Sequence, residues 1–181
     1  MTYELVGNWK GGLAFDLHTI GSVFLGVDQY GQNRFDNTHS DMGKLVYQLK
    51  YRSDKSAVPK IIELLTTLTI EGFDAIIPVP SSKARALQPV DVIAEAFGAQ
   101  RGVPALIGHL TKAGNAQLKN IDDPVERTNA LANISVSGKT DISGKKVLLL
   151  DDLYDSGATL GACSNVNEIW VLTMTKTRSK R

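Results

Sequence analysis

Two adjacent carboxylates follow a short apolar run near the C-terminal end of the sequence. Residues 147–150 have the composition of a buried strand, and Asp151 and Asp152 come directly after them. In open α/β sheets, ligands bind at the carboxyl ends of the strands. Residues 155–159 then combine a glycine, two hydroxyls and a series of backbone N–H groups, and they lead into a predicted helix. Such a turn favours a phosphate, because its amides and the helix dipole both attract negative charge.

The same segment resembles a known family signature. Its order of apolar strand, two acids, two variable residues, Asp, Ser, Gly, any residue and Thr is similar to the motif of the type I phosphoribosyltransferases, which bind phosphoribosyl pyrophosphate (PRPP). The resemblance implies that Asp151 and Asp152 hold the ribose hydroxyls, directly or through the water shell of a Mg²⁺ ion. It also implies that five residues wrap the 5′-phosphate: Asp155, Ser156, Gly157, Ala158 and Thr159.

A second segment supports this resemblance. Residues 78–85 follow a predicted strand, at the place where this family has its pyrophosphate loop. The implied pyrophosphate ligands are Ser81, Ser82, Lys83 and Arg85, and the two cations would stabilise the departing anion. The implied lid, which excludes water, spans residues 112–127 and offers three cations: Lys112, Lys119 and Arg127.

Further landmarks are similar to the ComF-type proteins of this superfamily. They are residues 45–52, residues 77–80, and Gln117 together with residues 126–131. Many ComF-type proteins carry an N-terminal zinc module built from cysteines. This sequence has one cysteine, Cys163, so that module has no counterpart here. This difference argues against a role as an accessory protein of DNA uptake, which is the alternative that the ComF-type resemblance implies.

The resemblance implies a Mg²⁺-dependent transfer of the phosphoribosyl group from PRPP to a nitrogen nucleophile, which is a nucleobase or an amine, with release of pyrophosphate. The catalytic candidates are Asp151, Asp152 and Asp155. For Asp155 two roles remain open, because it could accept a proton near the nucleophile or cap the phosphate turn. An N-terminal hood would select the acceptor, with six candidate side chains: Trp9, His18, Phe24, Tyr30, Phe35 and His39.

Two alternatives fit parts of the sequence. A protein of the same fold could sense PRPP or a nucleotide without catalysis, and the basic residues 176–181 favour this regulator slightly. A receiver-like domain would use the acid pair to bind Mg²⁺ for phosphorylation. Here, however, the acids follow a late strand and lead into a phosphate-binding turn, which favours the transferase. Dimers are common in the superfamily, so a homodimer is compatible with the resemblance.

The elements that position these residues follow from hydrophobic spacing. A hairpin is expected over residues 22–38 around a polar turn at 28–32. Helices are expected at 42–51, from Pro59 onward, from Pro89 to Gly98 or Gly102, and briefly near Asp123. Strands are expected at 74–79, 103–107, 134–136, 146–150 and 169–175. The stretch 160–168 is short for a parallel crossover, which indicates that residues are missing near 164–167.

This order predicts an α/β fold, namely a Rossmann-like central parallel sheet with flanking helices. We expect one compact domain in which residues 1–41 form a small N-terminal hood with the hairpin and residues 42–181 form the phosphoribosyltransferase core. A length of 181 residues with 43% hydrophobic residues suits a single domain. The net charge of +1 gives no general attraction to nucleic acid or to an anionic membrane. No signal peptide or membrane-spanning run is found, so a cytoplasmic protein is expected.

Overall fold

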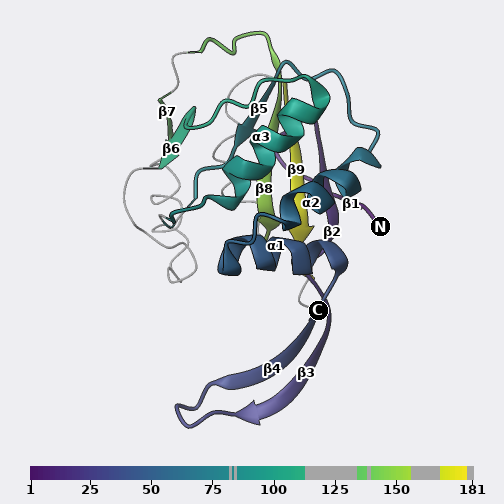
Figure 1. Ribbon diagram of the computed structural model, residues 1–181, viewed down its shortest axis with the longest axis vertical. Coiled ribbons are helices and arrows are strands. Elements are labelled where there is room, and N and C mark those ends of the chain that lie inside the picture. The colour runs from purple at the N-terminus through teal and green to yellow at the C-terminus, as the bar shows by residue number, and fades with distance from the viewer. Residues whose placement is uncertain (82, 84, 113–133, 138–139, 156–167, 179–181) are drawn as a thin grey trace.

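The centre of the protein is a five-stranded, mostly parallel sheet with the strand order β1-β2-β9-β8-β5. The computed structural model describes residues 1–81, 83, 85–112, 134–137, 140–155 and 168–178. The strands of this sheet are β1 (Tyr3–Glu4), β2 (Gly11–Leu17), β5 (Ala75–Pro78), β8 (Lys146–Tyr154) and β9 (Glu168–Lys176). Only the edge pair β1–β2 is antiparallel (Figure 1). The structure therefore has the predicted α/β architecture.

The two long central strands, β8 and β9, carry apolar side chains on both of their faces. Because successive residues of a strand point to opposite faces, Leu148 and Leu150 face one side of the sheet while Val147 and Leu149 face the other. All four are at most 1% exposed. This continuous apolar run is typical of a strand buried on both sides.

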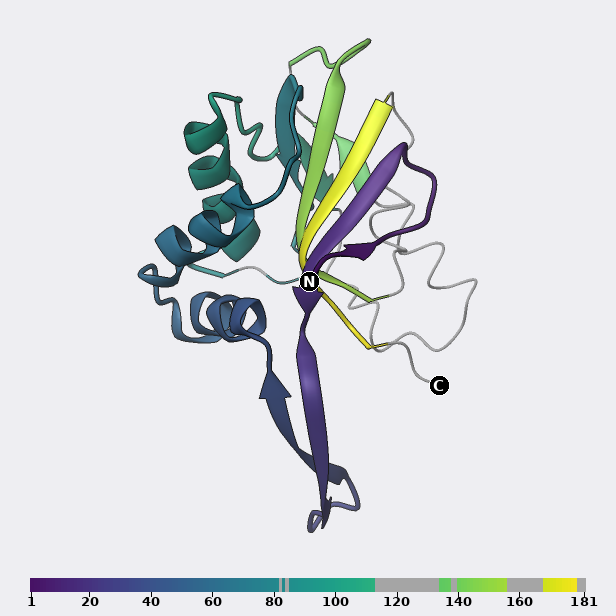
Figure 2. The same ribbon diagram turned by 90° about the vertical axis from the view of Figure 1, so that its right-hand side faces the viewer.

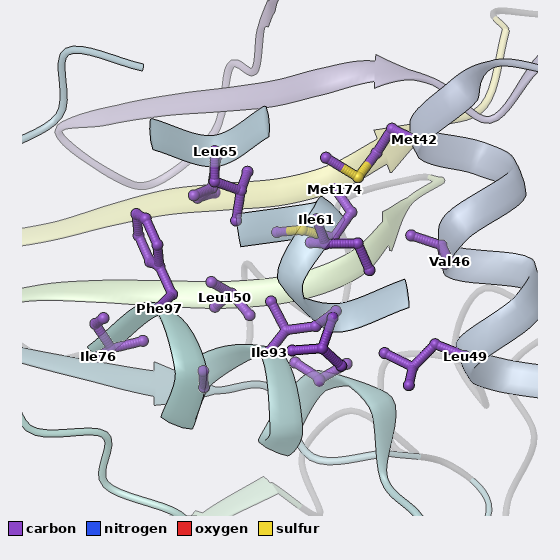
Figure 3. Packing of buried hydrophobic residues seen from close by; sticks show 14 of the residues in the cluster. Met42, Val46, Leu49, Ile61, Leu65, Ile76, Ile93, Phe97, Leu150 and Met174 are labelled. Atoms are coloured by element: carbon purple, nitrogen blue, oxygen red, sulfur yellow. The ribbon is translucent and has the colours of Figure 1, made fainter. Parts of the chain in front are cut away.

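Three helices lie on the same face of the sheet (Figure 2). They are α1 (Asp41–Arg52), α2 (Ala57–Thr66) and α3 (Pro89–Arg101). Their apolar faces meet the side chains of β5, β8 and β9 in one cluster, which Figure 3 shows around Phe97, Ile61, Leu150 and Met174. None of the described helices has both the length and the apolar character needed to cross a membrane.

Sequence signals at the helix ends explain these boundaries. The Ser40 side chain caps α1 by accepting a hydrogen bond from the Gly43 N–H at 3.0 Å. Pro89 begins α3, and Gly102 ends it in the left-handed conformation at φ 67°. The predictions of these helices, and of a helix near Pro59, are confirmed.

The N-terminal residues are divided between two sheets. β1 and β2 belong to the central sheet, because β2 pairs in parallel with β9. Residues 19–39 form the predicted hairpin, β3 (Thr19–Val27) with β4 (Asn33–His39), which projects away from the rest of the protein (Figures 1 and 2). The expected hood region thus contributes to the core as well as to the hairpin.

Two strand predictions need correction, and β1, β2 and one further strand were not expected. Residues 103–107 do not form a strand, since they make only an isolated bridge between Ala105 and Ile76. The strand β6 (Leu110–Lys112) was not expected and pairs with β7 (Ile134–Val136), whose prediction is confirmed. The strand expected at 146–150 continues to Tyr154, because β9 supplies pairing partners as far as Lys176. The helix near Asp123 and the segment 164–167 lie outside the described residues.

Gly43 allows α1 to approach the end of β2. A Cβ atom at this position would lie 2.4 Å from the backbone oxygen of His18. We therefore expect Gly43→Ala to lower the free energy of unfolding by about 1–3 kcal/mol, the usual cost of overpacking. Urea denaturation followed by circular dichroism measures this change. Gly21→Ala is the control, because its Cβ would meet Thr38 at an ordinary 3.5 Å. An equal effect of the two substitutions would contradict the expectation.

Candidate active site at the carboxyl edge of the sheet

The two segments that carry the predicted chemistry leave the sheet side by side. β5 and β8 are parallel neighbours, with Pro78 opposite Leu150. The Val79 N–H donates a hydrogen bond to the Leu150 carbonyl at 2.9 Å, so the loop after β5 begins beside Asp151. The structure therefore brings the loop of Ser81, Lys83 and Arg85 to the same sheet edge as the acid pair, although about seventy residues separate them in the sequence. No hydrogen bond between described residues joins this loop to the two acids.

The acid pair lies inside β8 and not after its end. Asp151 is opposite Thr173 of β9, and the ladder continues through Leu153 and Tyr154. Neighbouring side chains of a strand point to opposite faces, so Asp152 faces the helices and Asp151 faces the other side of the sheet. The two carboxylates therefore do not converge on one point in this conformation.

Asp152 forms a largely buried ion pair with Lys50. Their Nζ and Oδ2 atoms are 2.6 Å apart, and the two side chains are 21% and 12% exposed. Lys50 comes from the last turn of α1, where a cation also interacts favourably with the helix dipole. Lys50 could not be predicted as this partner, because no local pattern links two residues that lie 102 positions apart.

The pKa of the Asp151 carboxyl is raised, which favours its protonated form at neutral pH. Burial, and to a smaller degree the negative charge of Asp152, together raise the pKa of its carboxyl to about 8. A hydrogen bond from the Asp152 N–H to Asp151 Oδ1, 2.7 Å long, opposes this shift, as does the more distant charge of Lys50. Lys50 thus interacts with both acids. It forms an ion pair with Asp152, whereas the raised pKa of Asp151 favours its protonated form.

The Ser81 hydroxyl organises the loop after β5. It donates to the Lys83 carbonyl at 2.8 Å and accepts hydrogen bonds from the Lys83 N–H and from the Arg85 guanidinium. Gln88, at the start of α3, donates to the same Lys83 carbonyl at 3.1 Å. The Ser81 contact holds the guanidinium of Arg85 over this turn. Gln88 is a further loop residue that the sequence did not indicate.

The remaining predicted site residues are only partly described. Asp155 lies just past β8, where its Oδ1 accepts a hydrogen bond from the Thr177 hydroxyl at 3.1 Å. Lys112 is the last residue of β6. The other candidates lie outside the described residues: Ser82, Lys119, Arg127, Ser156, Gly157, Ala158 and Thr159.

One of the proposed acceptor-selecting residues, His18, is connected through Thr175 to the backbone of Asp152, and a second, His39, contacts His18. The Thr175 hydroxyl donates to the Asp152 carbonyl at 3.1 Å, which leaves its oxygen to accept from Nδ1 of His18 at 3.2 Å. The rings of His18 and His39 contact each other edge to face at 4.9 Å. The other acceptor candidates lie elsewhere, on the hairpin (Phe24, Tyr30, Phe35) or against Tyr154 (Trp9).

No protein-family model matches the sequence, and no curated protein matches it. Among solved structures, the chain is similar to three adenine phosphoribosyltransferases. The one from Thermoanaerobacter pseudethanolicus is 17% identical with a TM-score of 0.47, over 78% of this chain and 88% of that chain. The enzyme from Saccharomyces cerevisiae is 12% identical (TM-score 0.48, 86% and 83%), and that from Leishmania tarentolae is 12% identical (TM-score 0.46, 94% and 78%). At these scores the likeness assigns no function, which must be argued from the residues themselves.

The ion pair of Lys50 gives a stability prediction. Lys50→Met keeps most of the aliphatic stem but leaves a buried carboxylate without its partner. We expect it to lower the free energy of unfolding by about 3 kcal/mol. Lys44→Met is the matched control on the same helix, because Lys44 pairs with an Asp41 side chain that is 89% exposed. That change should cost less than about 1 kcal/mol in urea denaturation. Similar losses in both variants would argue against a special contribution from Lys50.

The raised pKa of Asp151 gives a pH prediction. In the unfolded chain this carboxyl titrates near its model value of 3.8, whereas in the folded protein it titrates near 8. Between these values the folded state binds the extra proton, so the free energy of unfolding should fall as pH rises. Asp151→Asn removes this dependence. Its stability relative to the wild type should therefore improve from pH 5 to pH 8 by on the order of a few kcal/mol.

Urea denaturation at several pH values measures this difference. Glu63→Gln, which neutralises an exposed carboxylate of α2, serves as the control and should leave the pH dependence of the wild type unchanged. If Asp151→Asn shows the same pH dependence as the wild type, Asp151 is ionised at neutral pH and the electrostatic account is wrong.

Proposed function

We propose that this protein binds PRPP at the carboxyl edge of its sheet and transfers the phosphoribosyl group to a nitrogen nucleophile, with release of pyrophosphate. The observation that carries the proposal is the pairing of β5 with β8. It puts the loop of Ser81, Lys83 and Arg85 next to the strand that carries Asp151 and Asp152. The phosphate-binding signature follows that strand directly in the sequence.

The loop after β5 is suited to the pyrophosphate group. Its turn is held by the Ser81 hydroxyl, and Arg85 is already in contact with that hydroxyl at 3.3 Å. A guanidinium offers several donors in a fixed plane, which suits phosphate oxygens. Negative charge accumulates on pyrophosphate as the bond to the ribose breaks, so Lys83 and Arg85 would stabilise departure more than initial binding.

The two acids are suited to the ribose. Carboxylates accept hydrogen bonds from hydroxyls, and negative charge near the ring stabilises the positive charge that the ribose acquires in the transition state. Lys50 neutralises Asp152 in the structure, so ribose hydroxyls would have to share that carboxylate with Lys50 or displace it. Asp151, with its raised pKa, would first donate a hydrogen bond as the protonated acid.

The donor set also fits a Mg²⁺ ion that arrives with the substrate. Mg²⁺ usually takes one or two carboxylates and completes its shell with water and phosphate oxygens. Among the described residues one lysine, Lys50, pairs with these acids, and a further cation would favour the ionised form of Asp151 beside Asp152. Because they face opposite sides of β8, a contact through water suits them better than joint chelation. The ion would supply positive charge for the pyrophosphate oxygens.

Asp155 is the candidate for proton transfer. The nucleophile forms a bond to the anomeric carbon while the bond to pyrophosphate breaks, and its proton must pass to a base. Asp155 is exposed past the end of β8, and one of its oxygens is held by Thr177. The opposite oxygen is therefore oriented by this contact.

Calorimetric titration with PRPP tests the proposal. We expect the wild type to bind PRPP with Mg²⁺ and to bind it much more weakly without the ion. Asp151→Asn/Asp152→Asn should weaken the binding at least about tenfold, because the charge-assisted hydrogen bond lost at Asp152 alone is worth roughly 1.5 kcal/mol or more. Asp141→Asn, an exposed carboxylate on the loop before β8, is the control and should bind like the wild type.

The outcomes of this titration distinguish the candidate functions. Binding that survives the double substitution would place PRPP elsewhere, and a folded protein that does not bind PRPP at all would refute the proposal. If PRPP binds, pyrophosphate release in the presence of candidate bases and amines distinguishes a transferase from a sensor. Binding without release for any acceptor would favour the sensor.

A further inference from the structure

The β3–β4 hairpin exposes apolar side chains and contributes no residue to the buried core. No residue from Thr19 to His39 is buried, and six large apolar residues between positions 23 and 35 are more than half exposed: Val23, Phe24, Leu25, Val27, Tyr30 and Phe35. The hairpin is a separate two-stranded sheet (Figure 2). Two-stranded hairpins are at best marginally stable in water, so this one gains stability if further strands join it.

The two edges of the hairpin differ in their ability to accept another strand. β3 contains both register shifts of the pair, at Ile20 and at Leu25, where an extra residue interrupts its pairing with β4. Such bulges twist a strand and discourage edge-to-edge pairing. β4 has no extra residue and no proline from Asn33 to Thr38. The regular edge of β4 is therefore the one available for pairing.

The charges of β4 have no counterpart within their own hairpin. Arg34 is opposite Gly26, and Asp36 is opposite Val23. Both side chains are exposed, and neither belongs to an ion pair among the described residues. They flank Phe35 at equal distances along the strand. This arrangement makes the segment Asn33-Arg34-Phe35-Asp36-Asn37 complementary to an antiparallel copy of itself.

We propose that β4 pairs with β4 of a second copy of this chain, antiparallel, about a two-fold axis at Phe35. In this register Arg34 of each chain faces Asp36 of the other, so two opposite-charge pairs form. Phe35 faces Phe35, and Asn33 faces Asn37. A two-fold interface requires that each contact occurs twice, and this sequence meets that requirement residue by residue. The product is a four-stranded antiparallel sheet with the order β3-β4-β4-β3.

The aromatic residues add an apolar stripe to this sheet. Phe24 and Phe35 are cross-strand partners with ring centroids 5.5 Å apart. Side chains of directly opposite residues lie on the same face, so the two-fold pairing brings the Phe35 rings of both chains together and places a Phe24 ring on each side. The pairing thus covers part of the apolar surface that is exposed in the single chain.

Charge reversal tests the proposal. In sedimentation velocity over a range of micromolar concentrations, the wild type should form a dimer. Arg34→Asp places two carboxylates opposite each other at both pairs, and Asp36→Arg places two guanidinium groups there. Each variant alone should weaken dimerisation at least about tenfold, because favourable cross-strand pairs become repulsive ones. Mixing the two variants should restore the dimer, since the charges of one are then complementary to those of the other.

The controls test whether a loss of dimerisation is caused by the charges of β4. Lys60→Asp reverses an exposed charge on α2 and should dimerise like the wild type. Circular dichroism checks that each variant is folded. A wild type that stays monomeric at all concentrations overturns the proposal. The hairpin would then have to bind a different protein. A dimer that both single variants leave intact, or that the mixture does not restore, also overturns it, because the chains then associate through another surface.

Discussion

The parallel ladder of β5, β8 and β9 is the constraint on which the rest of the structure depends. Both faces of β8 are apolar from Val147 to Leu150, so the strand must be covered by protein on both sides. A shift of one residue would turn every side chain to the opposite face and move Asp152 away from the helices. The register therefore fixes which carboxylate meets Lys50. It also fixes where the chain leaves β5, and so the position of the loop that Ser81 organises.

Two acidic side chains, Asp151 and Asp152, lie next to each other in β8 at the carboxyl edge of the sheet. Lys50 compensates the charge of Asp152, and burial together with that charge raises the pKa of Asp151. Such an edge is costly to the folded protein, because burial of a charged group requires compensation. Perturbed carboxyls of this kind cluster at functional sites. The Thr175 hydroxyl, which joins the Asp152 backbone to His18, extends this polar network to the base of the hairpin.

Local patterns predicted most of the elements and missed contacts between distant segments. Most elements have sequence signals, such as caps, turns or apolar runs, within a few residues of their ends. These elements are the hairpin, the helices near Ser40, Pro59 and Pro89, and the strands near Ala75, Lys146 and Glu168. β2 was missed, because its stability comes from pairing with β9, about 160 residues away. The strand expected at 103–107 was wrong, because only Ala105 finds a partner in Ile76.

The candidate site was predictable to a similar extent. The acids and the loop after β5 stand out in the sequence, because each follows an apolar strand. The continuation of β8 through Asp151 and Asp152 was not predictable from their polarity, which is typical of a strand end. It depends on the β-branched residues Thr173 and Thr175 in the neighbouring strand. Lys50 could be assigned to Asp152 only once the helix had been placed against the sheet.

The hairpin has a consequence for how this protein can change over evolutionary time. Its residues from Thr19 to His39 contribute no buried side chain, and the chain enters and leaves it at neighbouring points beside α1. Substitutions, insertions or a complete exchange of this segment would therefore leave the packing of the core intact. The base of the hairpin is constrained at one position. Gly43 of α1 must remain glycine there, because a Cβ atom would clash with the His18 carbonyl. The hairpin is thus a module in which new surface properties can arise at little cost to folding.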